Sequence, residues 1–88
     1  MSKKEKLLKR FLSIPHPTDF RWDELVTMLS GLGFDAFEST GGSSHKHFVH
    51  RGNADWAIVQ ARPHPSGILK IYQIKQVTEF LREKGLIE

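Results

Sequence analysis

The fold of this chain is organised around the stretch Thr40-Gly41-Gly42-Ser43-Ser44-His45-Lys46-His47-Phe48-Val49-His50-Arg51. Its first half consists of small residues typical of a loop, and its second half alternates in a way that predicts a β-strand. Successive side chains of a strand point to opposite faces, so Phe48 shares a face with Lys46 and His50. Phe48 is the expected core residue. We therefore expect His45 and His47, on the other face, to point toward solvent beside a glycine-rich loop.

An exposed imidazole beside such a loop suits binding and proton transfer at a phosphate. Cleavage of RNA needs a base for the 2′-hydroxyl proton, an acid for the 5′-oxygen and positive charge around the phosphorus. Histidine, with an unperturbed pKa of about 6.5, is suited to both proton transfers near neutral pH. Lys46, Arg51 and the backbone N–H groups of residues 42–44 are candidates for the positive charge.

Two other interpretations of these histidines remain open. In the first they are ordinary surface residues, which is the default for any single histidine and the one adopted for His16 and His50. In the second, His45 and His47 hold a metal ion from the same strand face. No cysteine and no convincing acidic third ligand accompanies them, so we predict neither a metal site nor a cofactor.

The composition is that of an ordinary globular protein. A length of 88 residues favours one domain with one core, and 39% of the residues are hydrophobic and 26% charged. The chain has no cysteine, which excludes a disulfide framework and suits a cytoplasmic protein. No apolar run approaches the length of a membrane span or of a signal-peptide core. We expect a cytoplasmic protein with no membrane partner.

The net charge of +3 is distributed in blocks. Residues 1–10 and residues 43–76 are predominantly basic, whereas residues 11–42 are predominantly acidic. The histidine strand lies in the second basic block. This pattern favours an anionic ligand near the strand, of which nucleic acid is the commonest. A mixed-charge solvated surface explains the charge pattern alone at least as well.

Apolar periodicity predicts three helices. Residues 3–12 form a short leading helix that ends before Pro15 and Pro17. The second helix carries one apolar stripe and is followed by Gly33; because Arg21 is a poor N-cap, Thr18 or Asp19 is expected to begin it. The third ends at Gly85. The stripes of the second and third helices are Trp22, Leu25, Val26, Leu29 and Leu32, and Ile71, Ile74, Val77, Phe80 and Leu81.

Two further strands are predicted at residues 34–39 and 55–62, and a tight turn at Gly52-Asn53 precedes the latter. Both faces of the strand at 55–62 carry apolar residues, so alternation does not decide which of them meets the core. The order is helix–strand–strand–strand–helix after a short leader. A sheet of three meandering strands is too small to bury a helix on each face, so both helices should pack on the same face. We therefore predict an α+β two-layer sandwich with one open sheet face, the arrangement of double-stranded-RNA-binding domains.

The histidine stretch resembles a known family. Gly42-Ser43-Ser44-His45-Lys46-His47-Phe48 is similar to the Gly-Ser-His-x-x-aromatic signature of the HicA family, the RNA-cleaving toxins of HicA–HicB toxin–antitoxin pairs. Other segments follow a longer branch of that family in order, and the similarity covers roughly residues 18–88, which leaves residues 1–17 as a basic extension and linker. These segments are Trp22-Asp23-Glu24-Leu25, Gly33-Phe34, Arg62-Pro63-His64-Pro65 and Lys84-Gly85-Leu86-Ile87.

The resemblance implies roles for individual residues. His45 takes the catalytic position, because it precedes the strand aromatic Phe48 by three residues. Ser44 is an insertion relative to the signature, and it leaves open whether His47 shares the work. The resemblance and the charge pattern together indicate substrate contacts at Gly42, Ser43, Ser44, Lys46, His47 and Arg51, with secondary contacts at Arg62 and His64.

The function that we expect is that of a cytoplasmic endoribonuclease toxin. The resemblance implies cleavage of translated messenger RNA and inhibition by a HicB-like antitoxin. The chemistry of the histidine strand implies a metal-independent reaction with His45 as general acid or base. The alternatives are a catalytically silent RNA-binding domain of the same fold and a scaffold whose only partner is an antitoxin-like protein.

Overall fold

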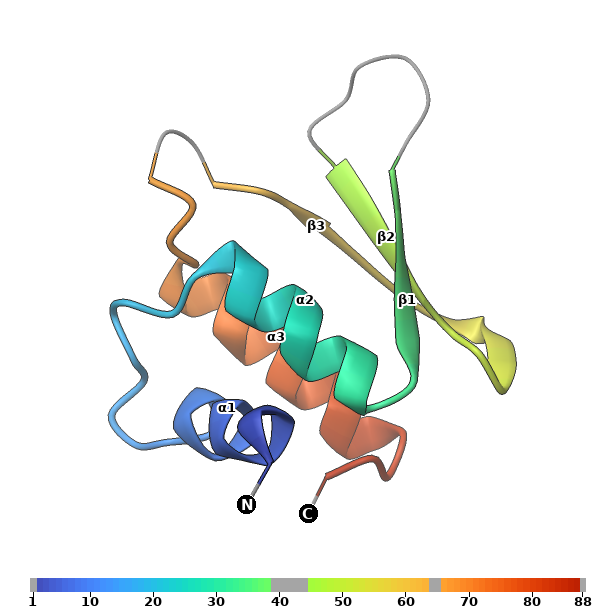
Figure 1. Ribbon diagram of the computed structural model, residues 1–88, viewed down its shortest axis with the longest axis horizontal. Helices are drawn as coiled ribbons and strands as arrows, with labels where there is room; N and C mark the ends of the chain where they lie inside the picture. Colours follow the sequence, from blue (N-terminus) through green and yellow to red (C-terminus); the bar gives the residue numbers. More distant parts are fainter. Residues whose placement is uncertain (1, 39–44, 64–65, 88) are drawn as a thin grey trace.

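The computed structural model describes residues 2–38, 45–63 and 66–87, with the backbone alone for Glu38 and His45. A leading helix is followed by a helix, three strands and a final helix, so the predicted α+β order is confirmed (Figure 1). This order is consistent with the double-stranded-RNA-binding arrangement. The elements are α1 (Lys3–Phe11), α2 (Trp22–Gly31), β1 (Phe34–Glu38), β2 (His45–His50), β3 (Asn53–Ala61) and α3 (Ile71–Glu83).

The three strands form one antiparallel sheet in the order β1-β2-β3. Phe34, Phe48 and Ile58 are buried on the face that meets the helices. The ambiguity of the third strand is resolved by this register, because Ile58 and Gln60 are buried whereas Val59 is 51% exposed. The other face of the sheet carries exposed residues, as predicted for an open face.

The turn between β2 and β3 lies one residue earlier than predicted. His50 pairs with Asn53, so the turn consists of Arg51 and Gly52, and β3 spans 53–61 rather than 55–62. The N–H of Arg51 donates a 2.8 Å hydrogen bond to the carbonyl of Gly33, which anchors the turn to the end of α2. A register shift after Val49 brings the extra residues into β3.

The prediction that Thr18 or Asp19 begins the second helix is wrong. Arg21 is the N-cap, and its N–H donates to the Glu24 carboxylate at 3.0 Å. The reason is tertiary: the N–H of Leu69 donates to Phe20 O, and the N–H of Trp22 donates to Gly67 O, each at 2.8 Å. These bonds keep the chain before Trp22 extended, so the helix starts only after it.

The core lies between the sheet and the helices. Trp22 of α2 packs on Phe48 of β2 with ring centroids 5.6 Å apart. Ile74, Val77 and Leu81 are buried from α3, as the predicted stripe requires. Ile71, also placed on that stripe, is 37% exposed because it is the first residue of the helix and precedes its buried turns.

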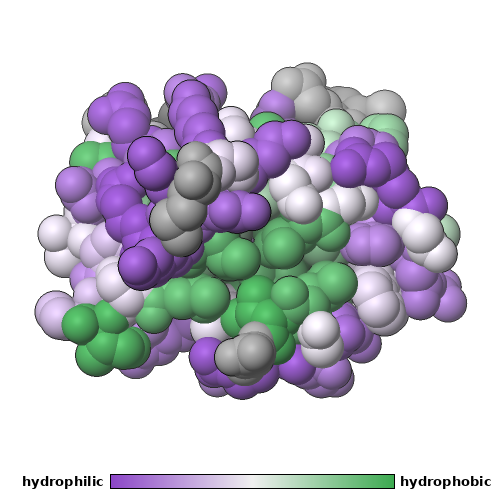
Figure 2. Space-filling view, turned by 60° about the horizontal axis from the view of Figure 1, so that its bottom comes forward, coloured by the Kyte–Doolittle hydropathy of each residue, from purple (hydrophilic) through white to green (hydrophobic). Residues whose placement is uncertain are grey.

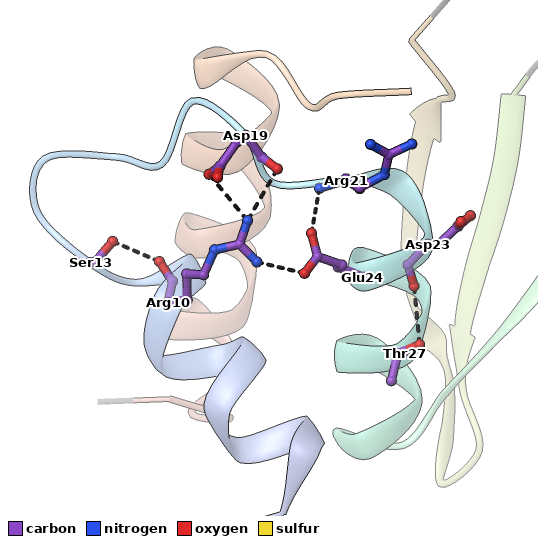
Figure 3. A network of polar contacts seen from close by, with 7 residues as sticks. All are labelled: Arg10, Ser13, Asp19, Arg21, Asp23, Glu24 and Thr27. Carbon is purple, nitrogen blue, oxygen red and sulfur yellow. Dashed lines mark hydrogen bonds and ion pairs between the residues drawn. The ribbon is translucent and has the colours of Figure 1, made fainter. Parts of the chain in front are cut away.

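The leading helix α1 is docked on the same core. Its Leu7 and Phe11 are buried, and the Phe11 ring lies 5.0 Å from Phe20, edge to face. Arg10 extends the contact with polar bonds to the Glu24 carboxylate at 2.6 Å and to the Asp19 carboxylate at 3.1 Å (Figure 3). An acidic side chain at the start of α2 therefore holds the end of α1.

This polar contact shifts two pKa values. The hydrogen bond to Glu24 raises the pKa of Arg10 above its ordinary value, against the effect of burial and with help from Asp19. Burial alone raises the pKa of the Glu24 carboxyl, but hydrogen bonds from Arg10 and from the Arg21 N–H outweigh it and hold the pKa below its usual value. Both shifts favour the charged pair.

Candidate functional site

Four of the residues predicted to handle RNA lie at the end of the sheet where β2 begins and β3 ends. The backbone of His45 pairs with Ala61, and Lys46 pairs with Glu38 on one side and Gln60 on the other. Arg62 follows directly after Ala61. This end therefore gathers His45, Lys46, His47 and Arg62 within a few residues of one another. Gly42, Ser43, Ser44 and His64 lie outside the described residues.

Arg51 lies at the opposite end of the sheet. Six residues of extended chain separate it from His45, or about 20 Å at the rise of a strand. Its guanidinium forms an ion pair with the Asp35 carboxylate at 2.5 Å and donates to the Ser30 carbonyl at 3.1 Å. The structure thus does not bring Arg51 together with the histidine end, and it places a carboxylate against its charge.

A row of three side chains crosses the open face beside that end. Phe37 pairs with His47 across β1 and β2, and His47 pairs with Val59 across β2 and β3. All three are exposed, Phe37 at 54% and Val59 at 51%, which agrees with the predicted solvent-facing position of His47. Phe37 and Val59 were not among the site residues predicted from sequence. Their position opposite His47 follows from the pairing of β2 with β1 and β3, and the sequence of a single strand does not contain that pairing.

A buried amide network supports the end of β3 from below. Gln73 of α3, 3% exposed, donates from Nε2 to the Ala61 carbonyl at 2.9 Å and to Gln60 Oε1 at 3.2 Å. Gln60, 8% exposed, in turn donates to Gln76 Oε1 at 3.0 Å. Because Ala61 is the partner of His45, the network ties the position of the candidate catalytic residue to α3. Glutamine on a strand or helix is usually exposed, so no signal in the sequence indicated this buried network.

Arg62 is exposed and lies close to the turn before α3. Its Nη2 atom is 3.8 Å from the position that a Cβ on Gly67 would occupy. The carbonyl of Gly67 accepts the hydrogen bond that starts α2. The guanidinium therefore lies near the point where α2, α3 and the end of β3 converge.

His50, interpreted from sequence as a residue without a functional role, makes structural contacts. Its ring lies 5.1 Å from Phe34 and 5.1 Å from Trp56, in both cases edge to face. Its Nδ1 accepts a 3.0 Å hydrogen bond from the Gly52 N–H. His50 thus helps to hold the β2–β3 turn.

Other features of the surface lie away from the histidine end. A hollow of about 170 Å³ lies between α1 and the end of α2 and is lined by Leu8, Met28 and Leu32 together with Ser2, Lys4, Glu5 and Gly31. Figure 2 shows apolar side chains visible among hydrophilic ones on one face of the molecule.

Within the described residues, no three histidine, aspartate or glutamate side chains are grouped as a metal ion would require. None of the described helices has both the length and the apolar character to cross a membrane.

The comparison with known families gives a match over most of the chain. The model of the family described as "HicA toxin of bacterial toxin-antitoxin" matches residues 22–86, which include the whole sheet, α2 and α3. This chain belongs to the HicA family. HicA proteins are the toxins of toxin–antitoxin systems, and membership implies an antitoxin as partner. No curated protein and no solved structure matches the chain.

Proposed function

We propose that this HicA protein is an endoribonuclease that cleaves messenger RNA and is held inactive by a HicB-like antitoxin. The observation that carries the proposal is the family match, which covers the strand with His45 and its two neighbours in the sheet. The gathering of basic and imidazole residues at one end of β2 supports the same assignment, because phosphate binding and proton transfer are needed at one place.

In this proposal His45 is the general acid or base of a metal-independent reaction. A base removes the proton of the 2′-hydroxyl, the 2′-oxygen bonds to phosphorus, and the bond to the 5′-oxygen breaks as that oxygen takes up a proton. The products are a 2′,3′-cyclic phosphate and a 5′-hydroxyl. Lys46 and Arg62 supply positive charge near the reacting phosphate, together with the backbone N–H groups of Gly42, Ser43 and Ser44.

The remaining predicted residues take secondary roles. His47 contacts the substrate two positions along the strand from His45, and His64 acts beside Arg62. Arg51, because it lies at the far end of the strand and faces Asp35, is assigned to the RNA backbone away from the reacting phosphate. An RNA that contacts both ends of β2 would extend along the sheet.

The test combines growth and chemistry. Induction of the chain in a bacterial host without the antitoxin should arrest growth, and the purified protein should cut single-stranded RNA in the presence of excess EDTA. The cut ends should carry 2′,3′-cyclic phosphates. Activity that EDTA abolishes and a divalent ion restores would contradict the metal-independent mechanism. A folded protein that binds RNA without cutting it would instead be the silent RNA-binding domain.

A further inference from the structure

We propose that Phe37, His47 and Val59 form a subsite that binds an unpaired RNA base on the open face of the sheet. The proposal rests on the proposed function, because it names the form of RNA that the same site accepts. Its basis is the register: the three residues are directly opposite one another on three neighbouring strands. Directly paired side chains stand about 4.5–5.5 Å apart at Cβ, so the row is continuous.

The chemistry of the row suits the face of a planar ring. Phe37 is an aromatic side chain with more than half of its surface exposed, and an exposed imidazole stands next to it. Every nucleic-acid base has a π-face that stacks on such side chains, and sheets that bind single-stranded RNA use exposed aromatics in this way. Val59, 51% exposed, closes the row with an apolar side chain.

Size and charge favour RNA over a protein as the occupant. A stable protein interface takes roughly 20–30 residues from each partner, whereas the described row offers three side chains, with the Arg51–Asp35 ion pair farther along the sheet. The chain has a net charge of +3, and Lys46 and Arg62 lie at the same end of the sheet. Single-stranded RNA combines a negatively charged backbone with exposed base rings, and it therefore matches a small row of apolar and imidazole side chains at the basic end of the sheet.

The row also selects unpaired RNA. In an A-form duplex the base faces are stacked on one another and are not available to an aromatic side chain on a sheet. His47 lies two residues from His45, about 7 Å along the strand. The base held by the row therefore belongs to a nucleotide close to the reacting phosphate, and the subsite prevents cleavage within duplexes.

The test measures affinity with a short fluorescein-labelled 2′-O-methyl RNA of mixed sequence, which lacks the 2′-hydroxyl nucleophile and stays intact. Phe37→Ala should weaken binding of the single strand about tenfold, within the range for loss of one stacked base. Phe37→Tyr should bind as the parent does, whereas Phe37→Leu, which keeps apolar bulk without a π-face, should bind weakly. Binding of the same RNA annealed to its complement should not change.

Tyr72→Ala is the matched control, because Tyr72 is an aromatic residue of α3 that is 56% exposed, close to the 54% of Phe37. It should leave single-strand affinity unchanged. Phe37→Ala with parental affinity, or an equal loss for single strand and duplex, would overturn the subsite. A Phe37→Ala protein that binds RNA normally but no longer binds the antitoxin would also overturn the subsite, because the row would then be a protein contact. If Phe37→Ala does not fold, Phe37→Leu decides the question.

Cleavage of unmodified RNA separates the two proposals. If the parent protein binds RNA through Phe37 but does not cut it, the subsite stands and the endoribonuclease is refuted. If the parent cuts RNA and Phe37→Ala matches it in affinity and rate, the endoribonuclease stands and the subsite is refuted. A parent protein with no affinity for either RNA refutes both.

Discussion

Gln73 of α3 donates a 2.9 Å hydrogen bond from its side chain to the carbonyl of Ala61, the residue that pairs with His45. One buried amide thus connects the first turn of α3 to the end of β3, the strand that pairs with His45. The same amide also donates to Gln60 Oε1, and its oxygen accepts the Lys70 N–H at 3.0 Å.

Gln73→Ala should lower the free energy of unfolding by about 1–3 kcal/mol, because it leaves buried polar groups without their partner. Gln76→Ala, at an exposed position of the same network, removes one part-buried hydrogen bond and should cost less, about 0.5–1 kcal/mol. Urea unfolding of both variants measures the difference, and amide exchange should be faster at the end of β3 in Gln73→Ala. Equal stability of the two variants would show that the buried amide contributes little.

His45→Ala should separate catalysis from binding and from stability. Phosphate binding relies mainly on lysine, arginine and backbone groups, so affinity for RNA should fall only modestly. The rate of RNA cleavage should fall by about 10²-fold or more, as expected when a general acid–base group is lost. His47→Ala should reduce cleavage less. If His47→Ala is the inactive variant and His45→Ala cuts normally, the inserted Ser44 has moved the catalytic position by two residues.

Glu24→Gln should remove part of the contact between α1 and α2 in a pH-dependent way. The pKa of Glu24 is lower in the folded protein than its ordinary value of 4.5, so the unfolded chain binds more protons around that pH. The stabilisation is therefore present above pH 4.5 and is lost as the pH falls through the folded value.

At neutral pH the variant should be less stable by about 1 kcal/mol, a modest figure because the pair is partly exposed, and the difference from the parent should shrink as the solution is acidified. Chemical denaturation at several pH values measures it. Glu79→Gln, which removes an exposed carboxylate of α3, is the control and should show no such convergence. A difference that grows on acidification would contradict the sign of the pKa shift.

Gly33→Ala should destabilise the protein by two separable effects. Gly33 has φ of +98°, which L side chains rarely adopt, and a Cβ there would lie 2.8 Å from His50 Nε2. Gly85 has φ of +73°, but a Cβ there would meet no described atom within 4 Å. Gly85→Ala should therefore cost only the backbone term of about 1–2 kcal/mol, and Gly33→Ala more. Thermal unfolding of Gly33→Ala, of His50→Ala and of the double variant measures the steric part as a coupling energy, and Gly85→Ala gives the backbone term alone.

The antitoxin should cover the histidine end of the sheet. A nuclease with an open basic site would damage its host, so we expect an acidic partner that covers His45 and Lys46 and reaches Arg51 at the rim. Lys46→Glu should weaken binding of the purified partner, whereas Lys75→Glu, at an exposed site on α3, should not. An inhibited complex that leaves His45 open to solvent would rule out direct masking.

The helices and the order of elements were predictable because each element carries its own periodicity. The stripe from Trp22 to Leu29 and the alternation around Phe48 are local patterns, and local patterns determine secondary structure when they agree with the fold. The start of α2 was not predictable, because the pairing of residues 20–22 with 67–69 overrides the usual preference at an N-cap. The inward face of β3 was not predictable either, because it follows from the pairing of Ile58 with Phe48 and includes Gln60, whose side-chain partners lie on α3.

The candidate site was predictable only where it lies on one strand. His45, Lys46 and His47 are consecutive, so the sequence alone groups them. The distance of Arg51 from that group also follows from strand geometry, but its ion pair with Asp35 requires the β1–β2 register. The row of Phe37, His47 and Val59 requires two registers at once, and no single segment carries that information.

The docking of α1 has a consequence for how this protein is to be divided. The family match begins at Trp22, yet Phe11 is fully buried against Phe20, and Arg10 is bonded to the first turn of the matched region. The family match and the buried core therefore have different boundaries in this chain. A fragment that begins at the edge of the family match would retain every strand but would expose to water the apolar surface that α1 covers. We expect such a fragment to be poorly soluble because α1 is missing, whatever the solubility of the full chain.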